Sequence, residues 1–190
     1  AYNEYHNNIS DPYADMLNLV PTFGSPASDN LLSSNDGASP IPITPIGRVS
    51  AVTPQEIADY LEKVKEYEHA QKYNLNTIAD RAWMKNVMQV TGASDSYLGT
   101  VLCNYMDTYK QIIADTLTGA NVTIFCKNST DPVEQLSNER IAQLFEEGLS
   151  MVTYFGHSSS TILEFNIDNP QNYNNPGKYP FFSVNGCNAG

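Results

Sequence analysis

Hydrophobic and polar positions follow two periods along the second half of the chain. Short runs of β-branched and aromatic residues, bounded by glycine or proline, are typical of buried parallel strands. Between these runs, apolar residues recur every three or four positions, which indicates amphipathic helices. The predicted strands are 83–90, 121–126, 151–157 and 180–187, and the predicted helices are 98–117 and 137–147. This alternation predicts an α/β domain with a mainly parallel sheet and right-handed crossovers.

The first part of the chain has a different pattern. Residues 1–47 are rich in proline, glycine, serine and asparagine, which predicts extended segments and loops. A capping box at 53–56 then opens a predicted amphipathic helix that reaches about Ala70. We therefore predict a partial N-terminal subdomain with its connecting helix over 1–80, and a catalytic subdomain over 81–190.

Charge and apolar content exclude some classes of function. The net charge is -11 at pH 7, and no basic stripe relieves it, so nucleic-acid phosphates would be repelled. No segment approaches the ~20 consecutive apolar residues of a membrane span. Three cysteines are too few for a disulfide framework; Cys103 on a helix stripe and Cys126 inside a strand are predicted to be core thiols.

Two predicted strands each end in a reactive side chain. Gly156 and His157 close one strand, and Gly186 and Cys187 close the other. Catalytic groups collect at the carboxyl ends of parallel strands, so neighbouring strands would bring an imidazole beside a thiol. That pair is a cysteine nucleophile with its general base. A lone histidine or cysteine is usually structural, but their joint placement after glycines, which permit close backbone approach, favours catalysis.

Other chemistries fit the residues less well. Residues 156–160 nearly match the nucleophile elbow of serine hydrolases, but Ser160 replaces the final glycine and no histidine follows His157. Asp168 and its asparagine neighbours are not spaced like a calcium loop. The residues therefore predict no metal and no cofactor.

The strand ending in Gly-His, followed thirty residues later by Gly-Cys-Asn-Ala-Gly, resembles the gingipain family of cysteine peptidases, which are relatives of the caspases. Upstream segments at 21–24, 28–30 and 46–50 also resemble that family. The similarity extends from about Leu19 to Gly190.

This resemblance implies a caspase-like three-layer sandwich, secretion or cell-surface display by a bacterium, and hydrolysis of polypeptides through a thioester. Carried over by position, Cys187 would be the nucleophile and His157 the general acid and base. The backbone amides of Ser158 and Cys187 would form the oxyanion hole. Calcium is often bound in the family, but no matching ligand set is found here.

Two departures from the family pattern affect these implications. Ser158 stands where family members usually have glycine. Thr91 stands near the position of the acid that orients the histidine in arginine-specific members, and Asp95 lies close by in another register, so a preference for basic residues is not implied. Two alternatives follow: a catalytically silent binding or assembly module on the cell surface, and a sortase-like transpeptidase that resolves the thioester with an amine.

A final expectation concerns the chain after the nucleophile. Gly190 lies three residues beyond Cys187. The rest of the caspase-like domain, including much of the substrate groove, is expected from residues downstream, so this chain by itself is expected to be a poor catalyst. The sheet edge exposed without that segment is expected to pair with a second copy.

Overall fold

The computed structural model describes residues 29–34, 41–49, 51, 53–74, 77–93, 95–127, 135–158 and 172–186. The chain divides into two compact units, 1–57 and 58–190. The predicted subdomain boundary near residue 80 remains a prediction.

In the first unit, a bidentate ion pair joins two of the segments on which the family resemblance depends. Nε and Nη2 of Arg48 donate to the two carboxylate oxygens of Asp29, at 2.8 and 2.6 Å. Asp29 directly precedes the 3₁₀-helix η1 (Asn30–Ser33). The hydrogen bond from the Arg48 guanidinium lowers the pKa of the Asp29 carboxyl from its ordinary value. The pair therefore ties the start of η1 to a segment nineteen residues away.

The predicted capping box forms at the start of α3 (Pro54–His69). The Glu56 amide donates to Thr53 Oγ1 at 3.3 Å, and the Thr53 amide donates to Glu56 Oε2 at 3.4 Å. A π-helical turn, η2 (Ala70–Asn74), follows the helix. No residue of α3 is buried, although its apolar positions are spaced as the sequence predicts. The helix therefore forms, but its apolar stripe stays partly exposed.

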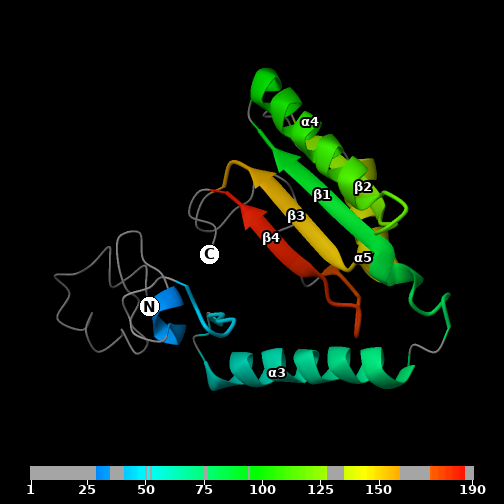
Figure 1. Ribbon diagram of the computed structural model, residues 1–190. Coiled ribbons are helices and arrows are strands. Elements are labelled where there is room, and N and C mark those ends of the chain that lie inside the picture. Colours follow the sequence, from blue (N-terminus) through cyan, green and yellow to red (C-terminus); the bar gives the residue numbers. More distant parts are fainter. Residues whose placement is uncertain are drawn as a thin grey trace. The chain divides into compact units, whose positions relative to one another are not determined.

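The second unit contains a parallel four-stranded sheet (Figure 1). Its strands are β1 (Asn86–Gly92), β2 (Asn121–Lys127), β3 (Met151–Gly156) and β4 (Phe181–Asn185), in the order β2-β1-β3-β4. Helix α4 (Ser96–Ile113) connects β1 to β2, and α5 (Gln135–Glu147) lies between β2 and β3 in the chain. Because the chain reverses direction across the sheet after β2, right-handed crossovers place α4 and α5 on opposite faces.

The core lies between the sheet and α5. Met88 and Val90 of β1 lie level with Val152 and Tyr154 of β3. These side chains form one buried cluster with apolar residues of α5 and the turn after it: Ile141, Leu144, Phe145 and Leu149. The predicted α/β fold class, a caspase-like sandwich around a parallel sheet, is thus confirmed in the described residues.

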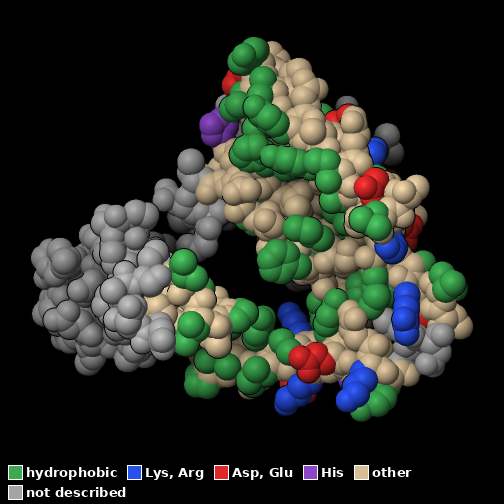
Figure 2. Space-filling model, viewed as in Figure 1, with side chains coloured by type: hydrophobic (Ala, Val, Ile, Leu, Met, Phe, Trp, Pro, Cys, Tyr) green, Lys and Arg blue, Asp and Glu red, His purple; other side chains and the backbone are tan. Residues whose placement is uncertain are grey.

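Helix α4 packs on the other face against β1 and β2, and part of its apolar surface stays exposed. Leu102 and Met106 are buried, but Figure 2 shows hydrophobic side chains gathered on the visible face of this region. The exposed ones are Tyr97, Tyr105, Tyr109 and Ile112. At the sheet edge, β4 also exposes apolar side chains, with Phe181 at 68%. Pairing of this edge with a second copy remains a prediction.

Two predicted boundaries are wrong. The first strand begins at Asn86 instead of residue 83, because Ala82–Lys85 forms a 3₁₀-turn that buries Trp83. The long helix ends at Ile113, although its apolar period continues to Leu117. There Asp115 Oδ1 accepts hydrogen bonds from the amides of Leu117 and Thr118, at 2.9 and 3.0 Å, and this local turn competes with the helix. Leu117 is consequently 92% exposed.

The prediction that Cys103 and Cys126 are core thiols is also wrong. The two residues form a disulfide that joins α4 to β2, with their Cα atoms 5.8 Å apart. That separation is ordinary for a disulfide. Their pairing depends on how α4 packs against β2, so the 23-residue spacing in the sequence did not reveal it.

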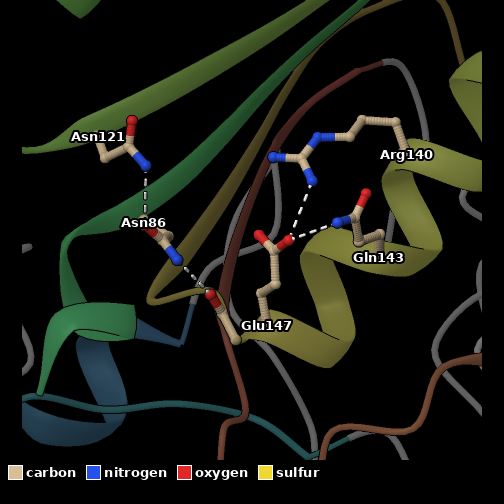
Figure 3. Close-up of polar contacts among 6 residues, drawn as sticks. Asn86, Asn121, Arg140, Gln143 and Glu147 are labelled. Carbon is tan, nitrogen blue, oxygen red and sulfur yellow. Dashed lines mark hydrogen bonds and ion pairs between the residues drawn. The ribbon is translucent and has the colours of Figure 1, made fainter. Parts of the chain in front are cut away.

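At the amino-terminal edge of the sheet, Asn86 links the starts of three strands (Figure 3). Its side chain accepts from Asn121 Nδ2 at 3.1 Å and donates to the Gly148 carbonyl at 3.0 Å. Its own carbonyl accepts from the amide of Ser150 at 2.9 Å. The register of β1 and β3 continues without a break from this edge, so the two strands also end level at the carboxyl edge of the sheet.

Candidate functional site

The carboxyl ends of β1, β3 and β4 form the edge at which the candidate residues were predicted. Gly92 at the end of β1 lies opposite Gly156 at the end of β3. On the other side of β3, Phe155 lies opposite Asn185 at the end of β4. The prediction that the His157 and Cys187 strands are neighbours is therefore confirmed. Cys187 itself lies outside the described residues.

His157 is exposed, but its backbone is held from both sides. Its amide donates to the Gly92 carbonyl at 3.0 Å. Its carbonyl accepts a hydrogen bond from the hydroxyl of Tyr154, a residue of β3 that is only 1% exposed. The histidine is thus fixed to the sheet while its side chain remains accessible to solvent. Tyr154 was not recognised in the sequence, where it looks like one more apolar strand residue.

Gly156 is glycine because a neighbouring strand occupies the space of a side chain. A Cβ atom at this position would lie 2.1 Å from the Gly92 carbonyl oxygen and 2.6 Å from the Gly92 nitrogen. From the sequence, the group expected to approach this glycine closely was the reacting carbonyl of a substrate. The structure shows that the close neighbour is the end of β1.

Gly186 has a similar role, with a side chain as its neighbour. A Cβ atom at Gly186 would lie 2.2 Å from Ser158 Oγ and 2.9 Å from Ser158 Cβ. The half-buried Ser158 side chain therefore lies over Gly186, and Gly186 is the residue that directly precedes Cys187 in the chain. The small residue at 186 thus accommodates the serine that departs from the family pattern.

The acidic and polar residues near the start of α4 have other roles. Asp95 is the N-cap of α4, and its Oδ1 accepts from the Leu98 amide at 2.8 Å. Thr91 is fully buried, and its hydroxyl oxygen has no hydrogen-bond partner among the described residues. Within the described segments, no acidic side chain forms an ion pair with His157. Among the described residues, neither Thr91 nor Asp95 therefore supplies a carboxylate to orient His157.

The described segments hold neither a cluster of metal-ligating side chains nor a membrane-spanning helix. They contain no group of three or more His, Cys, Asp or Glu side chains that could hold a metal ion. Asp168 lies outside them. Of the helices described, none is both long enough and apolar enough to cross a bilayer.

A comparison with protein families covers almost the whole chain. The model of peptidase family C25 matches residues 2–190. No curated protein and no solved structure matches significantly. The match includes both predicted reactive residues and every element of the sheet.

Proposed function

We propose that Cys187 and His157 cleave peptide bonds in polypeptide substrates, because the chain belongs to peptidase family C25, the gingipain family of cysteine peptidases. The nucleophile is the Cys187 thiolate, and His157 is the general acid and base. The backbone amides of Ser158 and Cys187 bind the oxyanion.

The register of β3 and β4 is the observation that supports this assignment most directly. Phe155 is opposite Asn185, the last residue of β4, so His157 and Cys187 each lie in the chain just beyond the end of one of two paired strands. Neighbouring strands lie ~4.8 Å apart, a spacing at which side chains from paired strand ends can reach each other for a proton transfer. The Gly156 carbonyl oxygen lies 3.3 Å from a Cβ built at Gly186, so the two chains are still close one residue beyond β4.

The reaction has two steps. The thiolate attacks the carbonyl carbon of the peptide bond, and the C–N bond breaks as the protonated His157 gives its proton to the leaving amine. His157 then takes a proton from water, whose oxygen attacks the thioester and releases Cys187 and the acid product. In both steps negative charge develops on the carbonyl oxygen, where each amide donor contributes about 3 kcal/mol.

The disulfide supports an exported location for this enzyme. Disulfides persist in oxidising compartments and are rare in reducing ones. The Cys103–Cys126 bond joins two elements of the catalytic unit. We therefore propose that the protein works outside the cytoplasm, either secreted or on the cell surface.

Hydrolysis of a mixed peptide library, followed by mass spectrometry, tests the proposal. We expect Cys187→Ala and His157→Ala to abolish cleavage. His69→Ala serves as a control, since His69 is an exposed residue at the end of α3. Unchanged cleavage by Cys187→Ala would contradict the proposal. A wild-type protein with no activity would support the silent binding module, and products carrying an added amine would support a transpeptidase.

A further inference from the structure

Tyr154 combines a core position with a polar contact at the candidate site. Its ring belongs to the buried cluster between the sheet and α5, and only 1% of the residue is exposed. Its hydroxyl donates a hydrogen bond to the carbonyl oxygen of His157. A buried tyrosine hydroxyl needs a partner, and here that partner belongs to the candidate general base.

The His157 carbonyl, which accepts this hydrogen bond, belongs to the same rigid peptide unit as the candidate oxyanion donor. The carbonyl of His157 and the amide of Ser158 belong to one planar peptide unit. In a trans peptide, the C=O and N–H bonds point in opposite directions. Because the carbonyl is held towards the buried Tyr154 hydroxyl, the Ser158 N–H is directed away from the core.

The peptide unit before His157 is held as well. The His157 amide donates to Gly92 at 3.0 Å, so the peptide units on both sides of the histidine are fixed to the sheet. A carbonyl that accepts a hydrogen bond also polarises its peptide unit, which makes the N–H a better donor. Oxyanion donors are most effective when they are already oriented before the reaction.

We propose that Tyr154 is a positioning residue for the oxyanion site, because its hydroxyl orients the His157–Ser158 peptide so that the Ser158 N–H faces the reacting carbonyl. This inference rests on the proposed function. It concerns both acylation and hydrolysis of the thioester, because negative charge develops on the substrate oxygen in each step. It does not concern formation of the Cys187 thiolate, which needs the imidazole and not the Ser158 amide.

The decisive variant is Tyr154→Phe, which removes the hydroxyl and keeps the ring. Tyr179→Phe is the matched control, since the Tyr179 hydroxyl also donates one hydrogen bond, to Glu66 at 2.6 Å, just before the amino end of β4. Four quantities are measured: kcat and KM for a cleaved peptide, the affinity of a peptide aldehyde, and the iodoacetamide rate at Cys187. The aldehyde forms a tetrahedral adduct whose oxygen needs the oxyanion donors, whereas iodoacetamide needs only the thiolate. Titration of active sites with a covalent inhibitor corrects for any unfolded fraction.

For Tyr154→Phe we expect kcat and aldehyde affinity each to fall about 10-fold, with KM and the iodoacetamide rate within about 2-fold of wild type. Replacement of Tyr154 by 4-aminophenylalanine, which restores a donor, should recover most of the loss. Tyr179→Phe should change none of these quantities.

Two results would overturn the inference. An unchanged kcat and aldehyde affinity would show that the hydroxyl serves only the core. An equal fall in the iodoacetamide rate would show that Tyr154 acts on the thiolate or on the whole site. A wild-type protein that cleaves no peptide and binds no aldehyde would instead refute the proposed function, and the inference would fall with its premise.

Discussion

The amide of His157 donates a hydrogen bond to the carbonyl of Gly92 at 3.0 Å, so the residue after β3 is tied to the end of β1. The candidate general base is therefore built on the central strands of the sheet, and not on a free loop. Sites held by regular elements keep their geometry better than sites on loops.

Gly156→Ala should be strongly disruptive. Its Cβ would lie 2.1 Å from a backbone oxygen of β1, and backbone cannot move aside as a side chain can. We expect a loss of at least ~2 kcal/mol in the free energy of unfolding, measured in urea. Gly47→Ala is the control, because nothing lies within 4 Å of a Cβ at Gly47. Equal stability of the two variants would show that the strands separate easily.

Removal of the disulfide should destabilise the second unit. A loop closed over 23 residues stabilises the folded chain by about 3 kcal/mol in the chain-entropy model. The Cys103→Ser, Cys126→Ser double variant should therefore unfold at lower urea concentration than the oxidised wild type. Wild type treated with dithiothreitol should match the double variant. If reduction leaves the midpoint unchanged, the two sulfurs are not bonded in solution.

The sequence predicted the elements of the sheet better than their ends. Runs such as 151–155 identify strands because burial on both faces requires continuous apolar character. The end of α4 was missed because Asp115 forms a local turn while apolar spacing continues beyond it. The 3₁₀-turn at Trp83 was missed because an apolar run does not reveal local curvature.

Only those features of the site that follow from the order of strands and motifs along the chain could be predicted. Gly-His and Gly-Cys at the ends of two strand runs pointed to the same sheet edge, and β3 and β4 are indeed paired. Tyr154 could not be found, because its hydrogen bond depends on how the chain turns after Gly156. The disulfide could not be found either, because it depends on tertiary packing of α4.

Thr91→Val should stabilise the protein. Thr91 is fully buried, and its hydroxyl oxygen has no hydrogen-bond partner among the described residues. Valine has the same shape without the polar atom, so we expect a gain of about 1 kcal/mol in the free energy of unfolding. Thr100→Val is the control, since the exposed Thr100 hydroxyl donates to Ser96 at 2.8 Å. A destabilised Thr91→Val protein would show that an ordered water or another group satisfies this hydroxyl.

The Asp29–Arg48 pair should make the first unit sensitive to acid. The hydrogen bond from Arg48 holds the pKa of Asp29 below 3.8 in the folded protein. A depressed pKa stabilises the folded state above the unfolded value, and this stabilisation is lost as pH falls through the folded value. Carboxyl chemical shifts followed from pH 5 to pH 2 by NMR should show a low Asp29 pKa that returns towards about 3.9 in Arg48→Gln. An identical Asp29 pKa in both proteins would show that the pair is absent in solution.

Labelling by a peptidyl acyloxymethyl ketone tests the central claim most directly, because this reagent needs a working nucleophile, a general base and bound peptide together. Intact mass spectrometry and peptide mapping should show one adduct per chain, on Cys187, with no adduct in Cys187→Ala and little in His157→Ala. Cys103 and Cys126 should stay unlabelled, since they are bonded to each other. Absence of labelling in the wild-type protein, or labelling of Cys103 or Cys126 in preference to Cys187, would contradict the account.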